Sequence, residues 1–103
     1  MITVSVLYPY KEGSKFDMNY YVNRHIPMVQ EKLGTALKGA DMVQGMGGPA
    51  PGSPPIYTAM IHMHFDSVEA FQGAFGPHAE TIMADIPNYT DVEPAIQISE
   101  VKM

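Results

Sequence analysis

Hydrophobic and polar residues alternate one by one in two stretches of the chain, as they do in strands that bury one face. The first stretch has its apolar positions at Ile2, Val4, Val6 and Tyr8. The second has them at Tyr57, Ala59, Ile61, Met63 and Phe65. β-Branched and aromatic residues favour a pleated, half-buried surface, so we predict strands over residues 2–8 and 56–65. Weaker alternation predicts two more strands, over residues 37–46 and 94–101.

After the first predicted strand, residues 17–34 carry the signals of a helix. Asp17 is a natural N-cap and Gly34 a natural stop. An apolar stripe at helical spacing joins Met18, Tyr21, Val22, His25, Val29 and Leu33. Pro27 cannot donate a hydrogen bond to the Asn23 carbonyl and clashes with it, so we expect the helix to bend near His25.

A second helix is predicted after the strand over residues 56–65. Asp66 and Ser67, with Glu69 three residues after Asp66, are typical of a capped helix start. Gly76-Pro77 interrupts the helix, and a second helical piece follows over residues 78–86. The inward positions of the two pieces are Val68, Phe71, Phe75, Ala79, Ile82, Met83 and Ile86.

One stretch is incompatible with regular structure. Residues 47–55 consist mainly of glycine and proline, and they join two predicted strands, so we expect a long hairpin loop. This stretch is too short to link two domains. A chain of 103 residues, 46% of them hydrophobic, fits one domain over residues 1–103.

The predicted order βαββαβ is typical of an α+β, ferredoxin-like fold with a four-stranded antiparallel sheet. Right-handed crossovers place both helices on one face of the sheet, above the fully apolar sides of its strands. The opposite face is mixed and carries Thr3, Ser5, Leu7, Thr58, Met60, His62, His64, Gln97 and Ser99. A second copy of the chain is the simplest cover for such a half-open face, so we expect a homodimer.

The amino-acid composition excludes several classes of function. Eleven acidic against six basic residues give a net charge of -5, which disfavours nucleic acid as a partner. The chain has no cysteine, which excludes disulfides, thiolate nucleophiles and zinc ribbons. No stretch approaches the ~18–20 apolar residues of a membrane span, and the N-terminus is typical of a strand rather than a signal peptide. We therefore expect a soluble, cytoplasmic protein without a membrane partner.

Several short motifs occur together along the chain. In order they are Leu7-Tyr8-Pro9, Phe16-Asp17, Tyr20-Tyr21, His25-Ile26-Pro27, Leu33-Gly34, Asp66-Ser67 and Phe71, followed by an isoleucine-rich terminal strand. Over essentially the whole chain, this set resembles the EthD family within the dimeric α+β barrel superfamily. The block from Phe16-Asp17 to His25-Ile26-Pro27 is its most specific part.

The resemblance implies a homodimer in which two sheets face each other and close a barrel. It does not imply a single reaction. Related barrels include cofactor-independent quinone-forming monooxygenases, muconolactone isomerases, polyketide cyclases and haem-binding or haem-degrading proteins.

His25 is the strongest candidate for a catalytic residue. Histidine titrates near neutral pH and can move a proton to or from a bound molecule. The alternative is a structural histidine held by a backbone carbonyl. We expect the Asn23 carbonyl, freed by Pro27, to hold one imidazole nitrogen and leave the other for a ligand. The match of His25 to the His-x-Pro position of the family favours the functional interpretation.

The remaining candidates are weaker. His62 and His64 project from the same side of one strand, but no third ligand accompanies them, so we expect no metal. We expect these two histidines, with Thr58 and Met60, to line a cavity. Off the apolar stripe or in a loop, Tyr20 and Tyr89 are candidates for a pocket rim. The carboxylates of Asp17, Asp66 and Glu69 are explained by capping and that of Glu31 by solvent exposure, and we assign none of these four to catalysis.

Three functions are compatible with these residues. The first is an enzyme, an oxidoreductase, monooxygenase or isomerase, that acts without a cofactor on a small hydrophobic, oxygenated or aromatic molecule. Its cavity would lie between the sheet and the first helix, with His25 as acid/base and with His62, His64 and Thr58 orienting polar groups. The second is a non-catalytic carrier or accessory protein of a degradation pathway. The third is a haem-binding barrel with a histidine as axial ligand.

Overall fold

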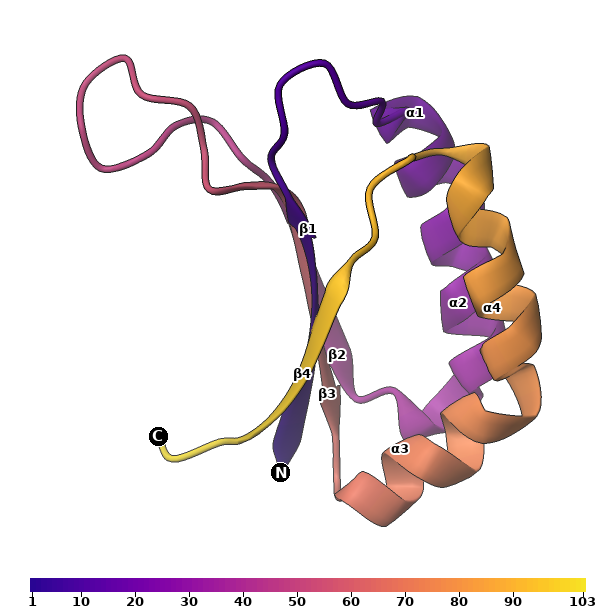
Figure 1. The fold of residues 1–103 in the computed structure, drawn as a ribbon. Helices are drawn as coiled ribbons and strands as arrows, with labels where there is room; N and C mark the ends of the chain where they lie inside the picture. Colours follow the sequence, from indigo (N-terminus) through magenta and orange to yellow (C-terminus); the bar gives the residue numbers. More distant parts are fainter.

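Four strands form one antiparallel sheet in the computed structural model, which describes residues 1–103 (Figure 1). The strands are β1 (Ile2–Pro9), β2 (Gly39–Gln44), β3 (Tyr57–Phe65) and β4 (Ala95–Glu100). Their spatial order is β2-β3-β1-β4. This arrangement confirms the predicted α+β, ferredoxin-like fold, although β2 and β4 are shorter at both ends than the pattern predicts.

Two interrupted helices connect the strands. The first consists of α1 (Met18–Tyr20), a π turn (Tyr21–His25) and α2 (Ile26–Leu33), with a 3-10 turn over Gly34–Ala36. The second consists of α3 (Val68–Phe75), a 3-10 turn over Gly76–His78 and α4 (Ala79–Asp85), and a further 3-10 turn follows over Ile86–Asn88. The expected interruption at Gly76-Pro77 is confirmed.

Both helices begin close to the predicted caps. The Asp17 carboxylate accepts a hydrogen bond from the Tyr20 N–H at 3.0 Å. The N-cap of α3 is Ser67, whose hydroxyl accepts from the Ala70 N–H at 3.1 Å; Asp66, one residue earlier, is exposed and does not cap the helix. Gly34 ends α2 at a φ of 58°, which a residue without Cβ adopts freely.

The predicted bend before Pro27 takes the form of a π turn. Ile26 donates its N–H to the Tyr21 carbonyl, five residues back, in place of the usual carbonyl four residues back. Tyr21 and His25 are buried at the two ends of this turn. Val22, expected on the apolar stripe, is 41% exposed. The prediction for Val22 is wrong because it assumes regular α-helical spacing, which the π turn interrupts.

The helices all lie on one face of the sheet, so the molecule has two layers (Figure 1). Between the layers lies a core of Ile2, Val4, Val29, Leu33, Ile61, Met63, Phe65 and Ile82. The predicted apolar sides of β1 and β3 thus face the helices. The loop between β2 and β3 projects from the end of the sheet away from the two termini (Figure 1). No helix combines the length and apolar character needed to cross a bilayer.

The other face of the sheet, here called the open face, has no covering layer within the chain. Thr3 Oγ1 lies 3.0 Å from Nδ1 of His64, and Ser5 Oγ lies 2.8 Å from Nδ1 of His62. The pairing of β1 with β4 adds Gln97 beside Ser5. This confirms that the face is mixed in character, with hydroxyl–imidazole pairs at its centre.

Candidate functional site

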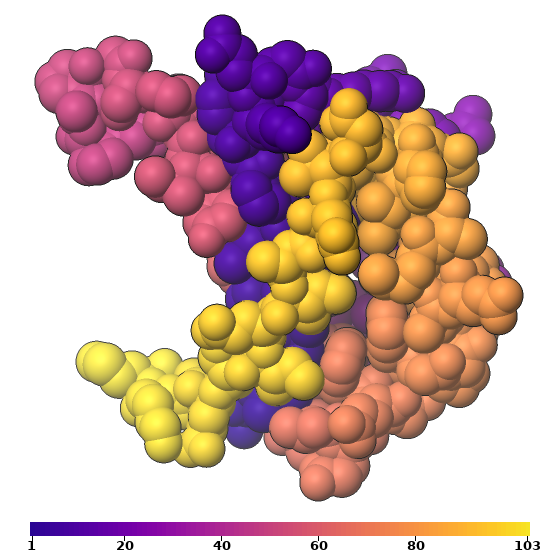
Figure 2. All heavy atoms as spheres, viewed as in Figure 1, coloured from indigo at the N-terminus to yellow at the C-terminus, as the bar shows by residue number.

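A narrow apolar pocket lies between the sheet and the helices. Its cavity volume is about 50 Å³, and 13 of its 15 lining residues are hydrophobic. Two lining residues are well exposed, Met83 of α4 (42%) and Ile96 of β4 (49%), and they mark the mouth. Figure 2 shows a narrow gap there, between the yellow atoms of β4 and the orange atoms of the helices. The pocket is therefore open beside β4.

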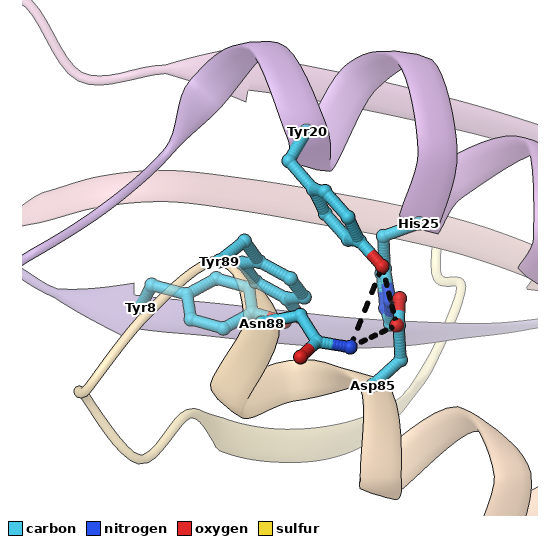
Figure 3. A network of polar contacts seen from close by, with 6 residues as sticks. All are labelled: Tyr8, Tyr20, His25, Asp85, Asn88 and Tyr89. Atoms are coloured by element: carbon cyan, nitrogen blue, oxygen red, sulfur yellow. Dashed lines mark hydrogen bonds and ion pairs between the residues drawn. The ribbon is translucent and has the colours of Figure 1, made fainter.

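His25 is the one residue of this lining that titrates near neutral pH. It is the last residue of the π turn and is only 4% exposed. Its Nδ1 lies 2.9 Å from Oδ2 of Asp85, the last residue of α4 (Figure 3). Its Nε2 makes no hydrogen bond within the chain. The structure thus holds one nitrogen of the imidazole and leaves the other free.

The contact with Asp85 fixes the tautomer of His25. A carboxylate only accepts hydrogen bonds, so in the neutral imidazole Nδ1 carries the proton and Nε2 carries the lone pair. Burial lowers the pKa of His25 below its ordinary value of 6.5, and the Asp85 carboxylate offsets only part of this effect. At neutral pH His25 is therefore uncharged and able to accept a proton at Nε2.

Asp85 is held by three hydrogen-bond donors. Besides His25, the Tyr20 hydroxyl donates to Asp85 Oδ1 at 2.7 Å and the Asn88 amide donates to the same oxygen at 2.9 Å (Figure 3). Burial alone would raise the pKa of Asp85, but the hydrogen bonds from Tyr20, Asn88 and His25 outweigh it and lower that pKa. Asp85 therefore stays ionised and fixed in position, as an acceptor that orients His25 must.

Local sequence places these groups together. Pro87 lacks an N–H and cannot continue α4, so the chain tightens into a 3-10 turn over Ile86–Asn88. Side chains three residues apart overlie one another in such a turn, which brings Asn88 onto Asp85. On the other side, the cap at Asp17 starts the helical segment that carries Tyr20. Two helix ends that are distant in sequence thus meet at one carboxylate.

Behind His25 lies an aromatic cluster. Tyr8, Tyr21 and Tyr89 are almost completely buried, and the hydroxyls of Tyr8 and Tyr89 are 2.5 Å apart. The His25 ring centre lies 4.6 Å from that of Tyr89 and 5.7 Å from that of Tyr21. Burial raises the pKa of all three phenols, so each keeps its proton at neutral pH. Tyr8 and Tyr21 also line the pocket.

The open face, not the pocket, contains Thr58, Met60, His62 and His64. Alternate residues of β3 face the helices, and these four are the residues between them. The expectation that His25 shares one cavity with His62, His64 and Thr58 is therefore wrong within a single chain. The structure brings none of the four to the His25 site.

The two tyrosines predicted at the rim have different positions. Tyr20 is half-buried outside the pocket lining, and its hydroxyl reaches Asp85. Tyr89 lies in a turn but is fully buried, with its ring packed against Tyr8 and Tyr21. The rim position is wrong for Tyr89, because aromatic packing draws the turn into the core.

Sequence reasoning missed Asp85 and Asn88, and it placed the partner of His25 wrongly. The Asn23 carbonyl does not hold the imidazole; Asp85 does. One signal points to Asp85: a carboxylate at the C-terminal end of a helix is unfavourable next to the negative end of the helix dipole. An acidic residue there, just before Pro87, indicates a compensating partner elsewhere.

The structure contains no group of three or more histidine or carboxylate side chains arranged to hold a metal ion. Nor does the pocket lining include a lysine or arginine. The site therefore offers one base and apolar walls that include the rings of Tyr8 and Tyr21. This combination suits a neutral organic ligand and proton transfer.

Comparison with known proteins identifies the family. The model of the EthD domain matches residues 13–93. The crystal structure of an EthD-like protein from Ralstonia eutropha JMP134 is similar, with 46% sequence identity and a TM-score of 0.95 over 99% of this chain and 92% of that one. No curated protein matches the chain.

More distant structures share the fold. An EthD family protein from Bacillus halodurans C-125 has 21% identity and a TM-score of 0.73 over 98% of each chain. A dimeric ferredoxin-like protein of unknown function from Thermobifida fusca YX has 16% identity and a TM-score of 0.59 over 97% of this chain and 90% of that one. Since the family model covers most of the sequence, this chain belongs to the EthD family.

Proposed function

We propose that this EthD protein is a small-molecule enzyme in which His25 is a general base and Asp85 orients it. The observation that carries the proposal is the 2.9 Å contact between His25 Nδ1 and Asp85 Oδ2 at the wall of an otherwise apolar pocket. A base held by a carboxylate through one nitrogen, with its second nitrogen free, is the arrangement that proton transfer requires.

Proton transfer would begin from neutral His25. Nε2 takes a proton from an O–H or acidic C–H group of the ligand, and Asp85 stabilises the imidazolium that forms. Return of the proton to a different atom of the ligand gives an isomerisation. Reaction of the ligand anion with dioxygen gives an oxidation that needs no bound cofactor. The same base thus serves both classes of reaction that we consider.

The pocket selects for a small hydrophobic ligand that carries oxygen. Its walls offer apolar contact, while His25 supplies the polar group. The ionised Asp85 carboxylate lies behind the site, and no cationic side chain lines it, so an anionic ligand is disfavoured. Haem fits this lining poorly because its propionates would find no lysine or arginine.

A homodimer is part of the proposal. The open face carries Leu7, Val43 and Met60 in one cross-strand row, and such an apolar row favours burial against a second copy. A related fold is described as dimeric, the protein from Thermobifida fusca YX. In such a dimer His62 and His64 would lie at the interface, where Thr58 and Met60 would also line any cavity between the sheets.

The experiment is to replace His25 and follow stability and function separately. His25→Gln should stay folded, with a melting temperature within a few degrees of wild type, or roughly 1 kcal/mol. Turnover of a panel of hydroquinones and lactones should fall at least about tenfold, a loss of ~1.4 kcal/mol. The control is His78→Gln, which alters a histidine outside the pocket and should leave turnover unchanged.

Two results would speak against this function. A large loss of stability with turnover per folded molecule intact would show that His25 is structural. Tight binding of a ligand that co-purifies, identified by mass spectrometry, with no turnover by wild type would instead indicate a carrier that uses the same pocket.

A further inference from the structure

An open groove adjoins the mouth of the pocket that contains His25. The groove has a volume of about 390 Å³, whereas the cavity volume of the pocket is about 50 Å³. Met83, Ile86 and Pro94 line both, so the groove continues the pocket outward between the end of α4 and the segment before β4. Sites for organic ligands commonly enclose about 300–1,000 Å³. The pocket alone is too small for such a ligand, and the pocket together with the groove is large enough.

The inner end of this combined site has one polar group. His25 is 4% exposed, and its Nε2 makes no hydrogen bond within the chain. Nε2 is not one of the fully buried polar atoms that lack a partner, so it keeps some exposed surface. Because His25 lines the pocket, a small group that enters there can reach this nitrogen.

The outer end of the site is negatively charged. Asp91 and Glu93 line the groove and are exposed, and no lysine or arginine lines it. Neither carboxylate forms a salt bridge within the chain. Asp91 accepts a hydrogen bond from the backbone N–H of Lys15 at 2.9 Å, which positions the carboxylate but brings no cation to it. The groove therefore combines apolar surface next to the pocket with two uncompensated negative charges.

We propose that the substrate has a small oxygen-bearing head that enters the pocket and an apolar chain that lies in the groove and ends in a neutral or cationic group beside Asp91 and Glu93. The inference rests on the proposed function of His25 and names the substrate class. A chain that ends in a carboxylate or phosphate is disfavoured, because its charge has the same sign as both groove carboxylates. Substrates attached to a phosphorylated carrier are disfavoured for the same reason.

The chain and the charge of the substrate contribute to affinity by different physical effects. Contact of the chain with Met83, Ile86 and Pro94 removes apolar surface from water, and its contribution grows with the area buried. Attraction or repulsion between exposed charges is instead screened by dissolved salt. The two contributions can therefore be measured separately by varying the chain and the salt concentration.

A matched series of hydroquinones tests this substrate class. It consists of hydroquinone, pentylhydroquinone and two pentyl analogues whose chains end in a trimethylammonium or a carboxylate group. We would measure dissociation constants without dioxygen, from the nuclear magnetic resonance signals of the His25 ring and the Met83 methyl group. Pentylhydroquinone should bind at least about tenfold more tightly than hydroquinone.

The charged analogues test the outer end of the site. At low salt the trimethylammonium analogue should bind at least about fivefold more tightly than the carboxylate analogue, the effect of one close pair of charges in water. In about 1 M NaCl this difference should fall to within about twofold, while the effect of the pentyl chain remains.

A double variant identifies the groups responsible for the charge preference. Asp91→Asn/Glu93→Gln should abolish the preference and leave the effect of the chain, and the new amide oxygen at position 91 can still accept from Lys15. The control is Glu31→Gln/Glu80→Gln, which removes the same net charge from exposed positions outside both cavities. The control should keep the preference.

The remaining outcomes overturn the inference in distinguishable ways. If pentylhydroquinone binds no more tightly than hydroquinone, the groove takes no part in binding. If the charge preference is absent, or survives in Asp91→Asn/Glu93→Gln, the two carboxylates do not select the substrate. In both cases the function of His25 stands, because His25→Gln tests it separately. If no member of the series binds wild type, the small-molecule pocket is refuted, and this inference with it.

Discussion

His25 and Asp85 are 60 residues apart in the sequence, yet a 2.9 Å hydrogen bond joins His25 Nδ1 to Asp85 Oδ2. The contact links the end of the π turn in the first helix to the end of α4 in the second. It also borders the pocket, because His25 belongs to the pocket lining. One polar contact therefore joins the two helices and also fixes the tautomer of the His25 imidazole.

The first prediction concerns the acceptor. Asp85→Asn removes the negative charge that holds the Nδ1 proton of His25, and the amide can donate to Nδ1 instead, which would place the proton on Nε2. Turnover should fall at least about tenfold, a loss of ~1.4 kcal/mol. Nuclear magnetic resonance of the His25 ring should show a pKa lower than in wild type, because Asp85 raises it.

The control for Asp85→Asn is Glu80→Gln, which removes a negative charge from an exposed position of the same helix. It should change neither turnover nor the His25 titration. If Asp85→Asn and Glu80→Gln behave alike, net charge rather than the contact with His25 is responsible.

The second prediction is a pH dependence of stability. The folded-state pKa of His25 lies below its ordinary value of 6.5 because of burial, so below pH 6.5 the unfolded chain binds a proton there more readily than the folded one. The free energy of unfolding should fall as the pH drops through this range and recover as the pH rises to 6.5. Urea midpoints measured from about pH 7.5 to about pH 5 should show this slope in wild type and a smaller slope in His25→Gln.

Asp85 acts in a lower pH range with the same sign. Its folded-state pKa lies below its ordinary value of 3.8, so the stabilisation it provides is present above that pH and is lost as the pH falls further. Equal slopes below pH 6.5 in wild type and His25→Gln would contradict the lowered pKa of His25, since His62, His64 and His78 are present in both proteins.

Local patterns in the sequence were sufficient to predict most of the fold. Strict alternation in residues 2–8 and 56–65 identifies both the strands and the side that faces the helices, because a strand turns alternate side chains to opposite faces. The same rule places His62 and His64 on the face of the sheet opposite to His25. Those two histidines therefore cannot share a cavity with His25 within one chain. Helix caps such as Asp17 can be predicted from the sequence because a cap bonds to backbone N–H groups only two or three residues away.

The site was only half predictable for a physical reason. His25 could be selected from its residue type and its position beside Pro27. Its partnership with Asp85 depends on how two helices dock on a sheet, and no periodicity of the sequence encodes that distance. The π turn is equally hidden, since it replaces an α-helical turn with no distinctive residue pattern, and it decides which of Tyr21 and Val22 is buried.

The third prediction concerns the paired phenols. Tyr89→Phe removes one member of the 2.5 Å contact and leaves the Tyr8 hydroxyl buried without its partner. The free energy of unfolding should fall by about 1–3 kcal/mol, and the melting temperature by roughly 4–8 °C for each kcal/mol. Thermal unfolding compared with Tyr57→Phe, which removes the same atom from a tyrosine outside the cluster, isolates the effect of the contact. Equal stability of the two variants would mean that the contact contributes nothing.

The fourth prediction tests the assembly. Wild type should behave as a dimer at micromolar concentration, burying roughly 1,200–2,000 Å² or more, and light scattering should give twice the 11.3 kDa of one chain. Met60 lies at the centre of the open face, opposite Leu7 and Val43. Met60→Glu places a charge in that apolar row on each copy, and two such charges repel across an interface that excludes water, so the dimer should dissociate.

Met46→Glu is the matched control, since Met46 is 98% exposed in the loop before β3 and should tolerate the same charge. A single 11.3 kDa species in wild type, or a dimer that survives Met60→Glu unchanged, would show that the open face is not the interface.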